Sequence, residues 1–244
     1  MYGCKPVSLN LMTRLRLFIV FLFIAYCSFG QIEKQANTIL MKRDFNEFKK
    51  FATSYATEKN ATRISFGISR DLANGFQESV FYITKSYPFN GVSITCNPRI
   101  NIITAGNLII YFHLESKEMK GFPKTFAITS DTTYNFSDPQ KIASLKSKFH
   151  QIFLVPLNEK ELFIDTIYYG NKCGHNGFST NEKEKTDAWV NTYDTLSLYQ
   201  WLQSTNTEKQ IYAVYGFNSL LLKGFKINAE LKRLIKTSCR KKVL

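Results

Sequence analysis

The stretch Ile64-Ser65-Phe66-Gly67-Ile68-Ser69 alternates apolar residues with small or polar ones. Successive side chains of a β-strand point to opposite faces, so a period of two predicts a strand with one buried face. A turn signal, Asn74-Gly75, follows it. Further strand-like runs are found at residues 79–84, 99–103 and 108–114. This part of the chain therefore predicts a central sheet that is mainly antiparallel.

Helical patterns lie on both sides of these strands. Apolar residues recur at steps of three and four over residues 31–58, which predicts an N-terminal helix. Asp138-Pro139 has the composition of an N-cap and first helical position. Towards the C-terminus, Thr205 and Glu208 have capping-box spacing, and Asn228 is a candidate cap for a third helix. We expect an α+β fold, with a C-terminal cluster of about three short helices.

The predicted domain organisation follows from the order of these patterns. Residues 1–30 are expected to be a signal peptide and residues 31–190 an α+β domain. Residues 191–244 are expected to be a helical region packed on that domain, because each apolar stripe is too small to form a core alone. Near the end of the predicted α+β domain, residues 170–185 are polar and contain glycine, which predicts a long loop.

The N-terminal segment has the three parts of an export signal. It contains three basic residues and no acidic one, followed by an uncharged apolar run over residues 17–26. That run fits a signal core of about 7–15 residues and is shorter than the roughly 20 residues of a membrane span. Ser28 and Gly30 are small residues at positions −3 and −1 of a cut before Gln31. We predict a periplasmic or secreted protein.

Two details of this segment stay open. Translation from Met12 in place of Met1 gives a more compact signal. Ile24-Ala25-Tyr26-Cys27 also resembles a lipoprotein cleavage box, although that box prefers a small residue where Tyr26 stands. A free mature chain is therefore expected in preference to one anchored by a lipid on Cys27.

The chain is basic, with 32 Lys and Arg against 19 Asp and Glu. Loss of residues 1–30 removes three basic residues and no acidic one, and so lowers the formal net charge from +13 to +10. The densest basic cluster, residues 232–242, has no aromatic residue to stack on bases. Nucleic acid is therefore not an expected partner. The expected partner is a protein or an anionic envelope polymer. Membrane contact is expected only through the signal segment or a lipid on Cys27.

Three cysteines follow the signal segment: Cys96, Cys173 and Cys239. An oxidising compartment permits one disulfide among them and leaves one thiol over. Cys96 and Cys173 lie in segments that contain turn residues, whereas Cys239 lies near the C-terminal end. The predicted pair is Cys96–Cys173.

The run Cys173-Gly174-His175-Asn176-Gly177 is the most chemically suggestive in the chain, with Asp165 upstream. A thiol with a nearby imidazole has the composition of a nucleophile and its base, and Cys-x-His can supply two zinc ligands. A disulfide cysteine in a turn explains Cys173 without any chemistry. Asp165, Cys173 and His175 are thus the catalytic candidates. No metal site or cofactor is predicted, because the sequence has no second ligand pair and no phosphate-binding loop.

Two stretches carry a resemblance to known proteins. Ser28-Phe29-Gly30-Gln31 resembles the end of the signal in many small exported bacterial proteins. Trp201-Leu202, residues 210–217 and Lys223-Gly224 resemble the helical C-terminal part of uncharacterised members of that group. The resemblance covers a small part of the chain. It implies a bacterial periplasmic or secreted setting and no activity.

Three functions are compatible with these observations. The leading hypothesis is a non-enzymatic exported protein that binds a protein or an envelope polymer, based on the missing catalytic motifs, the aromatic content and the basic charge. The second is an envelope hydrolase with a site around Asp165, Cys173 and His175. The third is a periplasmic immunity or inhibitor protein.

Overall fold

The protein is described here from a computed structural model of the whole chain. The structure describes residues 31–56, 62–89, 92–120, 127–167 and 179–239. The predicted signal peptide and Cys27 lie outside these residues. Within them, none of the helices combines the length and hydropathy that a membrane span needs.

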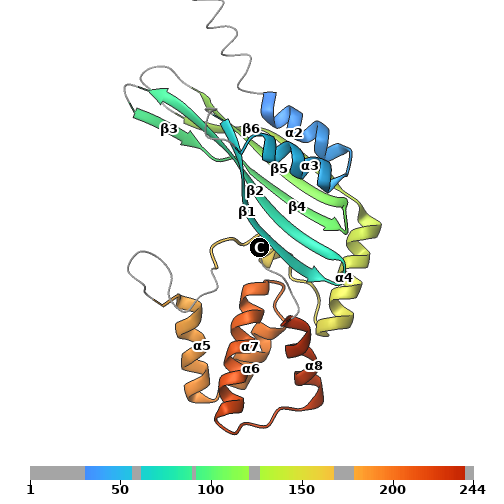
Figure 1. Cartoon of the computed structure of the whole chain (residues 1–244), viewed down its shortest axis with the longest axis vertical. Coiled ribbons are helices and arrows are strands. Elements are labelled where there is room, and N and C mark those ends of the chain that lie inside the picture. Colours follow the sequence, from blue (N-terminus) through green and yellow to red (C-terminus); the bar gives the residue numbers. More distant parts are fainter. Residues whose placement is uncertain (1–30, 57–61, 90–91, 121–126, 168–178, 240–244) are drawn as a thin grey trace, which may run out of the picture.

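Six antiparallel strands form one twisted sheet in the order β1-β2-β4-β5-β6, with β3 paired to β2 beside this path (Figure 1). Gly75 and Gly106 stand in the tight turns between β1 and β2 and between β4 and β5, with φ values of 80° and 60°. The predicted antiparallel sheet is confirmed. The strands are β1 (Thr62–Ala73), β2 (Phe76–Phe89), β3 (Val92–Cys96), β4 (Arg99–Ala105), β5 (Leu108–Lys120) and β6 (Ala127–Ser137).

Seven α-helices accompany the sheet in the described part of the chain, so the predicted α+β class is confirmed. Two helices precede the strands and five follow them, together with a short 3-10 helix, η1 (Glu159–Glu161). The α-helices are α2 (Gln31–Met41), α3 (Phe45–Ser54), α4 (Pro139–Phe153), α5 (Asn181–Thr192), α6 (Thr195–Leu202), α7 (Thr207–Leu222) and α8 (Ala229–Ser238).

The single N-terminal helix expected from periodicity is wrong, because the chain breaks between α2 and α3. Arg43 adopts a left-handed conformation with φ 63°, and Asp44 caps α3 by accepting a hydrogen bond from the Glu47 backbone N–H at 2.9 Å. The break allows Arg43 to pair with Asp138 at 2.7 Å. Periodicity does not reveal it, since buried residues recur at steps of four on both sides: Ile32, Ala36, Leu40, Phe48 and Ala52.

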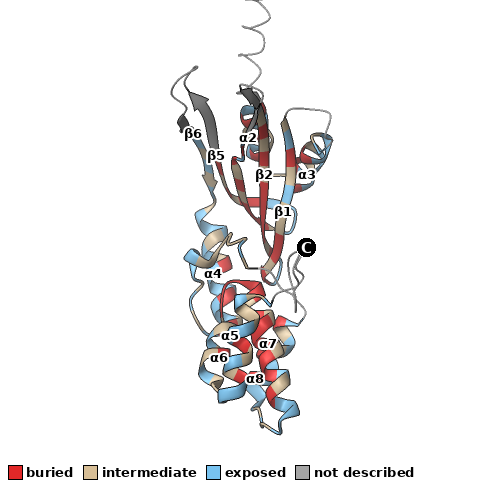
Figure 2. Ribbon diagram, turned by 90° about the vertical axis from the view of Figure 1, so that its left-hand side faces the viewer, coloured by how far each residue is buried: buried red, intermediate tan, exposed pale blue. Residues whose placement is uncertain are grey.

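The sheet separates two apolar clusters. Its α2–α3 face, the face that carries Phe81, packs against Phe48 and the other buried residues of those helices. Its α4 face, the face that carries Ile103, packs against Leu145 of α4. A third cluster fills the interior of α5–α8 and includes Phe149 from α4. Figure 2 shows buried residues running through the sheet at one end of the elongated molecule and through the helices at the other.

As far as residue 239, where the described residues end, the C-terminal helical region contains four helices and begins at Asn181. Helix α5 packs on α6 and α7, so the domain boundary expected after residue 190 falls inside α5. The loop expected over residues 170–185 likewise overlaps the start of this helix. Helix α5 was missed because its sequence is mostly polar, and only Thr186 and Val190 in it are buried. One buried valine and one buried threonine produce little apolar periodicity to recognise.

Candidate functional site

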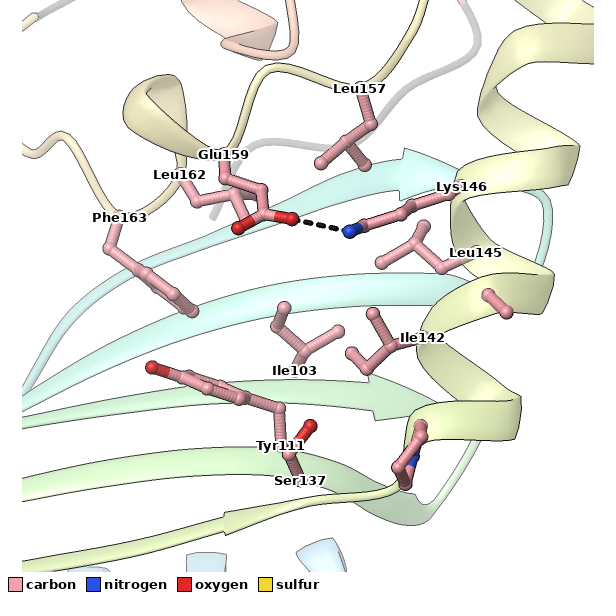
Figure 3. A pocket seen from close by; sticks show the side chains of 12 residues that line it. Ile103, Tyr111, Ser137, Ile142, Leu145, Lys146, Leu157, Glu159, Leu162 and Phe163 are labelled. Atoms are coloured by element: carbon pink, nitrogen blue, oxygen red, sulfur yellow. Dashed lines mark ion pairs between the residues drawn. The ribbon is translucent and has the colours of Figure 1, made fainter.

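A pocket of about 550 Å³ lies on the α4 face of the sheet. It lies between strands β4 and β5, helix α4 and the segment that follows α4 (Figure 3). Its volume falls within the range of about 300–1,000 Å³ that is usual for ligand sites. The apolar lining residues are Ile103, Tyr111, Ile142, Leu145, Leu157, Leu162 and Phe163.

Charged and polar groups stand at the edge of this pocket. Lys146 of α4 forms an ion pair with Glu159 of η1 at 2.5 Å, and both side chains are exposed. Figure 3 shows the pair reaching from the helix to η1 beside the apolar walls. Burial raises the pKa of the Tyr111 hydroxyl, and the nearby Glu159 carboxylate raises it further. The hydroxyl therefore stays protonated and able to donate a hydrogen bond.

Phe163 forms one wall of the pocket in a strained conformation. Its φ of 60° lies in the left-handed region, which is rare for an aromatic residue. The ring stacks on Tyr111, with centroids 5.8 Å apart and planes 20° from parallel. Its N–H donates to Glu78 Oε2 at 2.8 Å, and its carbonyl accepts from the Arg99 guanidinium. Such strain persists only where the surroundings hold it, and it concentrates at functional sites.

Glu78 belongs to a buried charge cluster of Arg70, Glu78 and Glu208, which joins β1 and β2 to α7. Arg70 Nη1 lies 3.2 Å from Glu78 Oε1, and Arg70 Nε lies 2.6 and 2.5 Å from the two Glu208 oxygens. All three side chains are at most 4% exposed. One guanidinium thus faces two carboxylates. Desolvation raises the pKa of both Glu78 and Glu208, although Arg70 opposes that rise.

The turn between α6 and α7 supplies one side of this cluster. Asn206 caps α7 by accepting from the Lys209 backbone N–H at 3.0 Å. Thr205 Oγ1 instead accepts from the Asn158 N–H at 2.8 Å. The capping box predicted from Thr205 and Glu208 is therefore wrong, because contacts with distant segments use both side chains. The turn can be polar and buried at once because its groups are largely hydrogen-bonded.

A polar row lies beside the pocket on the same face of the sheet. Asn101, His113 and Asn135 are direct neighbours across β4, β5 and β6. They lie two residues along their strands from Ile103, Tyr111 and Ser137, so they point to the same side. Within the described residues, Asn101 Oδ1 is buried and has no hydrogen-bond partner. The apolar pocket is therefore continued by side chains that can hydrogen-bond.

The structure places only one of the three predicted catalytic residues. Asp165 lies 3.8 Å from Arg99 Nη1 as an ion pair. Cys173 and His175 lie outside the described residues, so their grouping with Asp165 stays a prediction. Among the residues that are described, no three His, Cys, Asp or Glu side chains are grouped as metal ligands.

Within the described residues, Cys96 is a buried thiol that forms no disulfide. Its expected partner, Cys173, lies outside the described residues, and the pairing stays a prediction. Cys239 is a free and exposed thiol.

Sequence reasoning missed the pocket, because its residues come from four separate segments and form no local motif. A signal for the buried charge cluster was nevertheless present. Arg70 and Glu78 interrupt otherwise apolar strand patterns, and a charge at such a position needs a partner.

Comparisons of the chain with models of protein families, with curated proteins and with solved structures gave no match. The function must therefore be argued from the geometry of the site.

Stability is expected to fall as the pH is raised through the titration of the buried charge cluster. The ordinary Glu pKa is 4.5, and burial raises the values of Glu78 and Glu208 in the folded chain. Above about pH 4.5 the folded state thus binds more protons than the unfolded state, so the free energy of unfolding decreases with pH. The protonated carboxyl groups contribute their full stabilisation below the pKa of the unfolded state. That contribution is lost as the pH rises through the raised pKa values of the folded state.

Urea denaturation of the wild type and of Glu208→Gln at several pH values measures this effect. The variant loses one of the two titrating groups, so its stability should decline less with pH. Glu47→Gln, at an exposed carboxylate outside the buried charge cluster, serves as the control for the substitution itself. Equal slopes in all three proteins would contradict the prediction.

Proposed function

We propose that the protein is an exported, non-enzymatic binding protein of the bacterial cell envelope, and that it binds its partner in the pocket. The observation that carries this proposal is the pocket itself. It combines apolar walls, a strained aromatic residue held by two charged side chains, and hydrogen-bonding groups at its edge. Apolar concave sites with a few convergent polar groups are the usual form of a binding site.

The chemistry of the pocket favours a protein partner over an anionic polymer. Burial of carbon surface against these walls contributes about 25 cal/mol per Å², so apolar side chains of a partner gain most from entering it. Lys146 is the cation among the lining residues, and Glu159 already neutralises it. A polyanion would therefore find little net positive charge there. The polar row of Asn101, His113 and Asn135 can receive the polar groups that flank an inserted apolar side chain.

Ala143→Trp is expected to close the pocket and weaken binding by at least about tenfold. Ala143 lines the pocket from α4 and is itself exposed, so the larger side chain can enter the pocket without disturbing the core. The measurement is a fluorescence titration with 1-anilinonaphthalene-8-sulfonate, an apolar ring system with one sulfonate that serves as a stand-in for the partner. We expect saturable binding by the wild type.

Ser147→Trp provides the matched control. Ser147 is exposed on the same helix and does not line the pocket, so this variant should bind the probe like the wild type. The melting temperatures of both variants report whether either substitution disturbs the fold. The proposal fails if the wild type shows no saturable binding, or if both tryptophan variants lose it equally.

A further inference from the structure

The helical region ends in an exposed apolar tip, far from the sheet. The α5–α6 turn and the end of α7 both lie at this end of the molecule (Figure 1). Leu222 at the end of α7 is 91% exposed, although Leu220, two residues earlier, is fully buried. The apolar tip consists of Tyr193, Leu196, Leu221 and Leu222, with exposed fractions of 53%, 67%, 39% and 91%.

The two parts of the apolar tip are adjacent in space. Lys223, which follows α7, places its Nζ 3.2 Å from Asn191 Oδ1 at the end of α5. The same Nζ lies 5.7 Å from the centre of the Tyr193 ring. The α5–α6 turn and the end of α7 therefore form one surface and not two separate exposed patches.

The end of α7 is closed by a hydrogen-bonded turn. Gly224 adopts φ 87°, its N–H donates to the Leu221 carbonyl at 2.9 Å, and the Phe225 N–H donates to the Leu220 carbonyl at 3.0 Å. These two bonds form the Schellman motif that closes a helix C-terminus. Leu222 is thus presented to solvent by a fixed turn and not by a fraying helix end.

Tyr193 occupies a position that folding alone does not favour for tyrosine. It ends α5 in the left-handed region with φ 56°, and the Asp194 N–H closes the turn onto the Trp189 carbonyl at 2.8 Å. Glycine or asparagine is preferred at this place. A half-exposed aromatic ring kept there in a strained conformation indicates a function for the ring.

We propose that the apolar tip inserts into the interface of an anionic lipid bilayer. Exposed leucine and tyrosine side chains beside lysines are the composition of an interfacial membrane contact. Lys223 and Lys226 are both exposed in the segment that follows α7. Asp194, the N-cap of α6, is the acidic residue between Tyr193 and Leu196, and the chain after residue 30 carries a formal net charge of +10. Each lysine near an anionic surface adds attraction. From the sequence, membrane contact is expected only through the signal segment or a lipid on Cys27, and not through these helices.

The size and shape of the tip favour a bilayer over a protein partner. A stable protein interface buries about 800 Å² on each side, more than four side chains at the end of a helical bundle offer. A lipid headgroup layer needs no complementary surface and accepts protruding apolar side chains. This contact uses residues remote from the pocket, so its test is independent of the test of the proposed binding function.

Vesicle sedimentation tests the proposal with the protein purified after export. The wild type should sediment with vesicles of phosphatidylglycerol and phosphatidylethanolamine, and much less with phosphatidylcholine vesicles. Leu222→Ser should weaken binding by about tenfold, because it removes one buried leucine side chain from the lipid contact. Combined replacement of Lys223 and Lys226 by Ser should reduce both the binding and its sensitivity to salt.

Tyr193→Gly distinguishes a loss of vesicle binding from a loss of stability. Glycine relieves the left-handed strain, so the melting temperature should stay the same or rise while vesicle binding weakens. Met41→Ser, at an exposed residue of α2, is the control and should bind like the wild type.

The proposal is overturned if the wild type does not sediment with anionic vesicles, if it binds neutral ones equally, or if Leu222→Ser binds like the wild type. A dimer of the wild type that dissociates in Leu222→Ser would assign the tip to a second copy of the chain, and would also overturn it.

Discussion

Arg70→Met is expected to lower the free energy of unfolding by about 3–5 kcal/mol. Arg70 is fully buried and is the guanidinium that Glu78 and Glu208 share. Its removal takes away the guanidinium that contacts both buried carboxylates. Each carboxyl group must then be protonated, or remain charged at a cost to the stability of the fold. The loss should therefore be larger at pH 8 than at pH 5, in the direction expected from the raised pKa of both groups.

Urea denaturation measures this loss, and an exposed ion pair supplies the control. Lys42 pairs with Glu47 while both side chains are about half exposed, so Lys42→Met should cost at most about 1 kcal/mol. If Arg70→Met also lowers the free energy of unfolding by less than about 1 kcal/mol, the cluster is not desolvated and the prediction is wrong. The variant should also weaken probe binding in the pocket, because Glu78 holds the backbone of Phe163.

Phe48→Ala is expected to cost about 3–5 kcal/mol of stability through the cavity that it leaves. Phe48 is fully buried between α3 and the sheet. Its ring meets Phe81 of β2 edge to face, with centroids 5.1 Å apart. The side chain therefore links the N-terminal helices to the α2–α3 face, and its loss should loosen that packing without touching the pocket on the other face.

Phe66→Ala is the matched comparison for this prediction. Phe66 also contacts Phe81, with centroids 5.4 Å apart, but it is 50% exposed. Its truncation removes a ring contact of about 0.5–1.5 kcal/mol and leaves no closed cavity. Thermal or urea denaturation of both variants thus distinguishes the contribution of burial to stability from that of the ring contact. Equal losses would contradict the assignment of Phe48 to the core.

The buried charge cluster connects stability to the proposed function. It ties the helical region to the sheet through Arg70 and Glu208, and it positions the pocket wall through Glu78 and Phe163. Replacing such a cluster by apolar residues is often neutral or stabilising in other proteins. Its presence here is explained by the geometry that it imposes on the pocket more readily than by stability alone.

Local patterns predicted those parts of the fold that are decided locally. The alternation around Phe66 predicted a strand, and these residues lie in β1. A register shift between Phe66 and Ile68 interrupts the alternation and leaves Phe66 half exposed. Asp138 and Asn228 were predicted as helix caps, and both accept hydrogen bonds from backbone N–H groups three residues ahead. A cap is formed by neighbours in the chain, so sequence is sufficient to indicate it.

The sequence by itself thus determined the α+β class, the antiparallel sheet and several helix boundaries. Tertiary structure alone decided the break at Arg43, the contacts of Thr205 and the pocket around Phe163. Arg70 and Glu208 are separated by 138 positions in the chain, and no periodicity or spacing relates residues so far apart. Their pairing is favourable only after folding has removed water from both, which makes it a property of the packed interior and not of any segment.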